Sequence, residues 1–114
     1  MLPEGYSYEP LLDYLTIKDS NIEGIGLFTT EDIKDQEYLG ESHNVSNRGL
    51  KRTPLGGFIN HSSNPNCEID KIYDKDDYKE YGLFTLRKIN KGEELTVNYN
   101  EAICGIPEVC NLKQ

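Results

Sequence analysis

The chain has 114 residues, 20 acidic against 12 basic side chains, a formal net charge of −8 and 36% hydrophobic residues. This length predicts one domain with one core. The acidic balance argues against nucleic acid and anionic lipid as partners, since both need a basic face on the protein. It favours a protein partner with a basic segment, bound by a monomer or a small homo-oligomer.

Targeting features are missing from the expected places. The apolar runs are all shorter than the ~20 residues that cross a bilayer, so no membrane role is expected. The N-terminal residues 1–5 are not basic, and no apolar segment follows them, which predicts an intracellular protein that is not exported. Cytoplasm and nucleus remain equally open. The odd count of three cysteines then indicates reduced thiols.

Short apolar runs bounded by Gly, Asn, Asp and Pro predict many short strands. The charged segment 74–77 reads as a hairpin tip, the polar segment 44–55 as a loop, and 100–114 as irregular coil. In chain order, strands or brief apolar segments are expected at residues 14–18, 26–29, 58–59, 68–73, 81–86 and 94–99.

An internal repeat relates the two halves of the chain. Residues 26–39 (GLFTTEDIKDQEYL) align with residues 82–95 (GLFTLRKINKGEEL) at an offset of 56. Two copies are too few for a solenoid, so the pattern predicts two similar strand–turn–strand units, one in each half of an all-β domain. Gly92 can supply a positive φ in the second turn.

Three clusters carry residues that suit a binding site. The first is Gly24-Ile25-Gly26, where the backbone can approach a ligand closely. The second contains Asn60 and His61 after a short apolar segment, and the third ends at Tyr99. Each cluster taken alone has an ordinary structural explanation: a turn, side chains bonded to local backbone, or an aromatic residue at the edge of the core.

Taken in order, the three clusters resemble the SET-domain lysine methyltransferases. The matching blocks are 24–28 (GIGLF), 58–67 (FINHSSNPNC) and 89–99 (INKGEELTVNY). The resemblance covers roughly residues 15–101, and the chain length is similar to that of the short viral, phage and bacterial members.

The resemblance implies a fold and a domain organisation. The fold is mainly β, with short sheets and a threaded, pseudoknot-like C-terminal segment. Residues 1–114 would form a single SET domain, with a core at about 15–101 and a short tail at 102–114.

The resemblance also implies a function, a protein-lysine N-methyltransferase that uses S-adenosylmethionine. The methyl group would pass in line to a deprotonated lysine amine in a narrow channel. The backbone of Gly24, Ile25 and Gly26 would line the cofactor, and Tyr99 would be the catalytic residue at the methyl-transfer point. The amino-acid and adenine parts of the cofactor would be held by Asn60 and His61.

The channel positions depart from the family pattern. Where family members carry aromatic residues, the corresponding register places Ser42, next to His43, together with Ile69 and Val97. The insert that forms one wall of the substrate groove is reduced to 44–55. These departures keep open an alternative, a catalytically silent SET-like module that binds a basic peptide or a partner protein. A small β-domain without any ligand is a further alternative.

The cysteines do not match the zinc site found in many family members. Ser63 occupies the place of the first zinc-binding cysteine, and only Cys104 and Cys110 follow the core. Four ligands cannot be assembled from these residues, so no metal is expected. Cys67 is expected to be structural, and a nucleophilic pair of Cys67 with His61 is the remote alternative.

Overall fold

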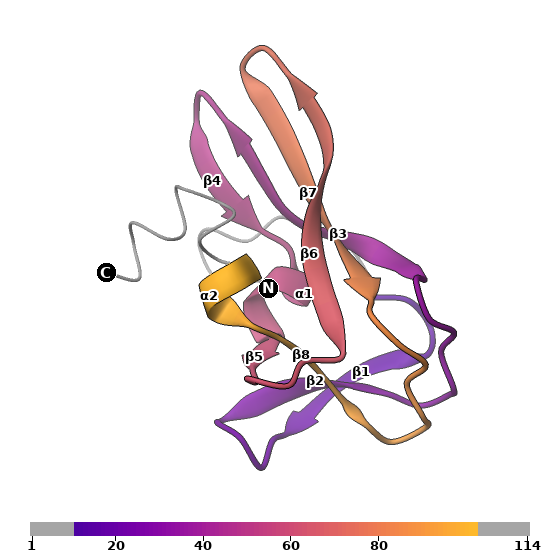
Figure 1. The fold of residues 1–114 in the computed structure, drawn as a ribbon. Helices are drawn as coiled ribbons and strands as arrows, with labels where there is room; N and C mark the ends of the chain where they lie inside the picture. Colours follow the sequence, from indigo (N-terminus) through magenta and orange to yellow (C-terminus); the bar gives the residue numbers. More distant parts are fainter. Residues whose placement is uncertain (1–10, 103–114) are drawn as a thin grey trace.

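The computed structural model describes residues 11–102 as two small sheets and two short helices (Figure 1). The mainly β fold predicted from the sequence is confirmed. In chain order the elements are β1 (Leu15–Asp19), β2 (Ile25–Thr29), β3 (Tyr38–Ser46), β4 (Gly49–Arg52), α1 (Pro54–Phe58), β5 (Asn60–His61), β6 (Cys67–Lys75), β7 (Tyr78–Thr85), β8 (Glu94–Val97) and α2 (Tyr99–Ala102).

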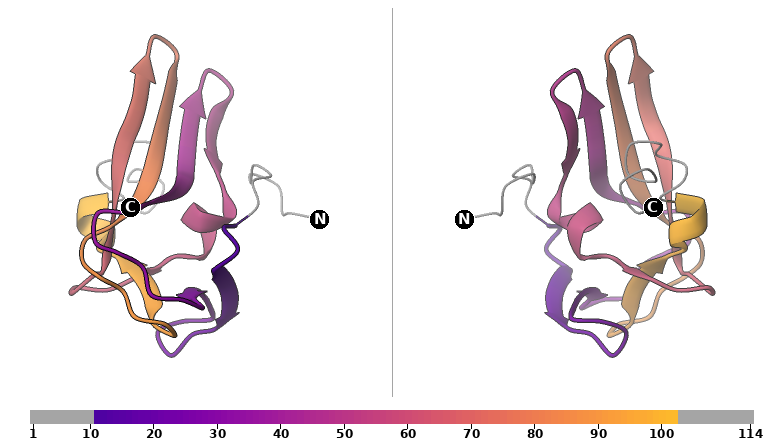
Figure 2. Two further views of the ribbon diagram at one scale, coloured as in Figure 1. Left: turned by 90° about the vertical axis from the view of Figure 1, so that its right-hand side faces the viewer. Right: turned by 90° about the vertical axis from the view of Figure 1, so that its left-hand side faces the viewer.

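Each sheet has four strands. The first has the order β1-β2-β8-β5 and the second β4-β3-β7-β6. All neighbouring strands are antiparallel except β5 and β8, which are parallel. In both views of Figure 2 the long hairpins of the second sheet extend away from the first sheet, and α1 lies between the two.

The core lies where apolar faces of the two sheets meet. Leu27 in β2 and Leu83 in β7 lie in this core and have no exposed surface. Burying a leucine of this kind contributes about 1.5–3 kcal/mol. The buried apolar residues are Leu15, Leu27, Ile33, Leu39, Leu55, Ile59, Cys67, Ile69, Tyr81, Leu83, Ile89, Leu95 and Val97.

The two copies of the repeat do not form separate strand–turn–strand units, as the sequence analysis expected. They interlock, because the first strand of each copy pairs with the second strand of the other. Phe28 pairs with Glu94, and its counterpart Phe84 pairs with Tyr38. Ile33 and Ile89 each donate a backbone hydrogen bond to the other, at 2.8 and 2.9 Å.

The remaining backbone bonds between the copies follow the same exchange. Thr29 N–H donates to Glu93 C=O at 3.2 Å, and the counterpart Thr85 N–H donates to Glu37 C=O at 3.0 Å. Their carbonyls accept from Gly92 N–H at 2.9 Å and from Gln36 N–H at 3.0 Å, respectively. The two copies are therefore related by an approximate two-fold symmetry, in which equivalent residues make equivalent backbone hydrogen bonds.

The prediction of a loop at 44–55 is wrong. Residues 38–52 form the hairpin of β3 and β4, and α1 begins at Pro54. Residues 44–52 of this hairpin are half-buried or exposed, and only Val45 and Leu50 among them pack as apolar side chains against the core, so the sequence is polar and lacks the alternation that marks a strand. The short helix includes Gly56, where an added Cβ would collide with the Ser42 carbonyl and lie 2.7 Å from His43 Cε1. Close packing therefore requires glycine there, despite its low helix propensity.

The predictions for segments 58–59, 74–77 and 100–114 have different outcomes. Segment 58–59 is not a strand, because Phe58 ends α1 and the next strand begins at Asn60. Residues 74–77 do form the tip of the β6–β7 hairpin, with Asp76 at φ 51°. The expected coil at 100–114 begins inside α2, and residues 103–114 lie outside the described part. Neither described helix has the length and apolar composition needed to cross a membrane.

Candidate active site

A tight turn between β1 and β2 carries the first predicted cluster. Ser20 N–H donates to Gly24 C=O at 2.8 Å, while Ser20 Oγ accepts from Ile22 N–H at 2.9 Å. Gly24 has φ 49°, in the left-handed region that glycine adopts without strain. The turn exposes half of the Ile25 side chain and leads into buried Gly26.

Asn60 joins this turn from β5, at the other edge of the first sheet. Its Nδ2 donates to Glu23 C=O at 3.1 Å and to Glu94 Oε2 at 2.8 Å. The Ser20 hydroxyl also donates to the Glu94 carboxylate, at 2.7 and 2.9 Å from its two oxygens. The structure thus brings Asn60 together with the turn that carries Gly24, Ile25 and Gly26.

Glu94 lies in this candidate site, although the sequence analysis did not single it out. An added Cβ on Gly26 would collide with the Glu94 carboxylate, so the missing side chain at Gly26 is what admits it. The neighbouring Glu93 bonds outward to Asn90 N–H and Arg87. In the sequence the two glutamates look alike, and only their partners in the folded chain distinguish the one bonded to Ser20 and Asn60 from the one bonded outward.

Tyr99 is held at its backbone, its ring and its hydroxyl. Its N–H donates to His61 Nδ1 at 3.0 Å, and the two rings lie 5.2 Å apart between centroids. Its hydroxyl donates to Ile59 C=O at 2.7 Å. Because His61 Nδ1 accepts, a neutral His61 ring carries its hydrogen on Nε2.

The environment of Tyr99 keeps its phenol neutral. Burial, followed by the nearby Glu23 charge, raises the Tyr99 pKa, and Arg52 opposes this rise. Because its one hydrogen is donated to Ile59 C=O, the neutral hydroxyl can orient a substrate amine by accepting a hydrogen bond from it, but it is a poor base at neutral pH. Tyr99 is therefore suited to positioning the substrate.

Asn66 ties the segment after β5 to β8. Its Oδ1 accepts from Thr96 N–H at 2.9 Å, and its Nδ2 donates to Glu94 C=O at 2.8 Å, so both ends of the buried amide bond to β8. In the sequence, Asn66 lies within the matching block 58–67 and was not singled out. The structure shows that it fixes the β8 backbone on either side of Leu95, directly after Glu94.

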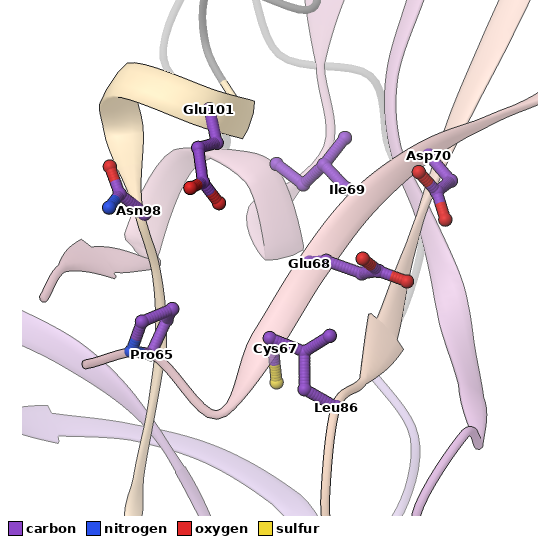
Figure 3. A pocket seen from close by; sticks show the side chains of 8 residues that line it. All are labelled: Pro65, Cys67, Glu68, Ile69, Asp70, Leu86, Asn98 and Glu101. Atoms are coloured by element: carbon purple, nitrogen blue, oxygen red, sulfur yellow. The ribbon is translucent and has the colours of Figure 1, made fainter. Parts of the chain in front are cut away.

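A pocket lies beside α2 and the start of β6 (Figure 3). Ile69, one of the predicted channel residues, forms part of its wall, and three carboxylates, Glu68, Asp70 and Glu101, surround it. The pKa of Glu68 is raised by burial first, and then by Asp70 and Glu101. The pocket is lined by Pro65, Cys67, Glu68, Ile69, Asp70, Leu86, Asn98 and Glu101.

The other predicted channel residues do not line this pocket. Val97 has no exposed surface, and Ser42 and His43 are buried in the second sheet. Ser42 Oγ lies 3.2 Å from Tyr81 C=O, to which it donates, and 3.0 Å from His43 Nδ1. Burial, with a smaller contribution from Arg52, lowers the pKa of His43 to about 4, so its ring is neutral at pH 7.

Cys67 does not have the properties of a nucleophile. It is buried, and burial raises the pKa of its thiol to about 12, against smaller opposing effects of Arg87 and a backbone bond with Thr96. A thiol with this pKa is protonated at neutral pH and unreactive. Cys104 and Cys110 lie outside the described residues.

Comparison with known proteins gives the family. The SET domain family matches residues 41–100. The H3 lysine-36 specific histone-lysine N-methyltransferase of Mycosarcoma maydis is 40% identical over 95 residues, which cover 75% of this chain and 9% of that protein. The protein of the same name from Chaetomium globosum is 37% identical over 92 residues, 81% of this chain and 9% of its own length. The chain belongs to the SET domain family.

A structural comparison agrees on the fold. The crystal structure of a candidate histone methyltransferase from Plasmodium falciparum superposes with a TM-score of 0.64 at 21% identity, over 77% of this chain and 94% of that one. The two curated relatives are fungal proteins of which this chain spans about a tenth. They give no support to the predicted short viral, phage or bacterial type.

Proposed function

We propose that this chain is an S-adenosylmethionine-dependent protein-lysine N-methyltransferase. The observation that carries the proposal is the placement of Tyr99. Its backbone is bonded to His61, and its hydroxyl to Ile59. His61 follows Asn60, which is bonded to the Ser20–Gly26 turn. Tyr99, whose hydroxyl can orient an amine, is thus linked through His61 and Asn60 to the glycine turn, whose backbone can hold a cofactor.

The residues present fit this cofactor. Asn60 uses both amide hydrogens within the protein, which leaves Oδ1 as an acceptor suited to an ammonium group. Gly24 and Gly26 present backbone with no side chain of their own, so a ligand can lie directly against it. When bound, S-adenosylmethionine supplies a sulfonium methyl group.

The chain's own residues prepare the substrate amine. A lysine with a pKa near 10.4 costs about 4 to 5 kcal/mol to deprotonate at pH 7. Burial against an apolar side chain such as Ile69 disfavours the charged form and reduces this cost, whereas the carboxylates of the same pocket favour the charged form as the lysine approaches. The Tyr99 hydroxyl then orients the lone pair of the amine for in-line attack, which is a positioning effect.

The substrate we propose is a protein with a lysine in a basic segment. The pocket of Figure 3 supports it, because Glu68, Asp70 and Glu101 place three carboxylates around the wall formed by Ile69. Asn98 and Glu101, which line this pocket, flank Tyr99 in the sequence. A histone tail has the required charge, and the names of the fungal relatives make histone H3 the first substrate to test.

The test is methyl transfer from labelled S-adenosylmethionine to histone H3, with the Tyr99→Phe variant beside the wild type. This variant keeps the ring and removes one oxygen. We expect cofactor binding to remain and turnover to fall about 100- to 1000-fold, the usual effect of losing one catalytic hydrogen bond. Tyr73→Phe, a change at an exposed tyrosine at the far end of β6, is the matched control.

Two outcomes would count against the proposal. Wild-type turnover by Tyr99→Phe would remove Tyr99 from the mechanism. Cofactor binding by the wild type, with no transfer to histone H3 or to any protein of a total lysate, would favour the silent binding module.

A further inference from the structure

The side chain of Glu94 is hydrogen-bonded to two separate segments of the chain. Its carboxylate accepts from the Ser20 hydroxyl on one side and from the Asn60 amide on the other. These two donors come from the end of β1 and from β5, on opposite sides of β8. Glu94 thus connects the two segments that the proposed function assigns to the cofactor.

The hydrogen count fixes the orientation of the Asn60 side chain. Its two nearest partners, Glu23 C=O and the Glu94 carboxylate, lie 3.1 and 2.8 Å away, and both can only accept. The nitrogen of the amide must therefore face them, whichever way the amide is first placed. The Asn60 oxygen then faces away as an acceptor, which selects a ligand group that donates.

The Ser20 hydroxyl has a similarly fixed direction. It accepts from Ile22 N–H at 2.9 Å, so its single hydrogen is directed to the Glu94 carboxylate. The turn after β1 is thereby anchored to the same carboxylate that orients Asn60.

The internal repeat shows that the fold itself does not require a carboxylate at this place. The counterpart of Glu94 in the first copy is Tyr38, and the counterpart of Gly26 is Gly82. A Cβ on Gly82 would lie 2.6 Å from Tyr38 Cε1, just as a Cβ on Gly26 would meet Glu94. The same backbone arrangement thus accommodates an aromatic ring, so packing against the glycine does not by itself require the carboxylate of Glu94.

We propose that Glu94 is a positioning residue for the amino-acid end of the cofactor. It holds the Asn60 amide with its oxygen directed to the ligand's ammonium group, and its negative charge favours a cation there. This inference rests on the proposed function and adds to it the residue that sets selectivity for the ammonium group. Ser20 acts through Glu94 in the same way.

The experiment measures two ligands against two variants. S-adenosylhomocysteine carries the ammonium group, and its deaminated analogue lacks only that group. Affinities are measured by calorimetry and, for weak binding, by competition with tritiated S-adenosylhomocysteine. Glu94→Gln removes the charge at nearly constant shape. Glu93→Gln removes the same charge from the adjacent residue, whose side chain bonds outward to Asn90 and Arg87.

We expect Glu94→Gln to weaken S-adenosylhomocysteine at least tenfold and to change the affinity of the deaminated analogue less than twofold. Glu93→Gln should leave both affinities within twofold of wild type. Ser20→Ala should show the same selectivity as Glu94→Gln with a smaller loss, and it serves as the second variant if Glu94→Gln does not fold.

Three results would overturn the inference: unchanged affinity of Glu94→Gln for S-adenosylhomocysteine, equal losses for the two ligands, or a wild type that binds both ligands equally well. Equal losses would make Glu94 a structural residue only. Failure of the proposed function is a separate result, in which the wild type binds neither ligand.

Discussion

Buried Gly26 of the first copy of the repeat lies against the carboxylate of Glu94 from the second copy, and Gly82 of the second copy lies against the ring of Tyr38 from the first. Around the first glycine, Ser20 and Asn60 donate hydrogen bonds. Around the second, the Tyr38 ring packs 5.2 Å from that of Phe84, with 48% of Tyr38 exposed. One backbone frame therefore supports a polar cluster in the first sheet and an aromatic surface in the second.

The shared frame explains which residues the two copies have in common. Thr29 and Thr85 make matching backbone bonds, and Ile33 and Ile89 pair with each other. At the positions that differ, Glu94 and Tyr38, the backbones also pair, with Phe28 and Phe84, but the side chains take no part in this pairing. Residues that build the frame are thus repeated, whereas the residues that give each sheet its own chemistry are free to diverge.

The largest expected effect tests whether the two copies contribute equally to stability. Leu27→Ala and Leu83→Ala each remove a fully buried side chain from equivalent positions. Each should lower the free energy of unfolding by about 2–5 kcal/mol, measured by urea denaturation. A loss below about 1 kcal/mol at only one of them would show that one copy can be loosened without the other, which the interlocked pairing does not allow.

The elements that the sequence predicted, such as β2, β7 and β8, carry short apolar runs bounded by turn residues. Each of these three strands contains one of the leucines of the repeat, and each is largely buried. The hairpin at 38–52 was missed because much of its stability comes from pairing of β3 with β7, a contact between residues about forty positions apart. The local sequence pattern does not reveal pairing between residues so far apart.

The site was predictable to a similar extent. The resemblance predicted the glycine turn, Asn60, His61 and Tyr99 as site residues, and the structure joins them through hydrogen bonds, while their roles stay predictions. Glu94 was missed because an acidic residue beside another acidic residue looks solvated. Ser42 and His43 were placed in a channel, whereas their burial follows from distant partners, Tyr81 and Gly56.

The second expected effect is a loss of folding stability at acidic pH, caused by the buried His43 of the second sheet. The folded-state pKa of His43 is lowered from 6.5 to about 4. Between these values the unfolded chain binds a proton that the folded chain does not, so stability falls as pH falls from 6.5 to 4. The loss should be about 3 kcal/mol.

Urea unfolding curves of the wild type and His43→Gln at several pH values isolate this contribution, because the carboxylates titrate in both proteins. The wild type should lose more stability than the variant across this range. Parallel pH dependences would contradict the assignment to His43.

A smaller effect separates the two glycines. Gly26→Ala forces the Glu94 carboxylate away from Ser20 and Asn60, and it should weaken S-adenosylhomocysteine about tenfold, as measured by calorimetry. Gly82→Ala displaces Tyr38, whose exposed ring can swing outward, and should leave cofactor affinity within twofold. Equal losses at the two glycines would mean that the polar cluster has no special link to the cofactor.

The smallest effect concerns the turns of the two copies, where Gln36 and Gly92 occupy equivalent places. Both have a positive φ, 55° and 90°, and each donates its N–H to a threonine of the other copy. Nothing lies within 4 Å of a Cβ added to Gly92, so only backbone conformation distinguishes the residues.

A left-handed conformation costs a residue with a side chain about 1–2 kcal/mol, and glycine avoids this cost. Against it stands the greater freedom of glycine in the unfolded chain, about 0.5–1 kcal/mol. Gln36→Gly should therefore raise the free energy of unfolding by less than about 1 kcal/mol, and Gly92→Gln should lower it by a similar amount. Urea denaturation of both variants decides the matter, since changes of the same sign would show that the two turns are not equivalent.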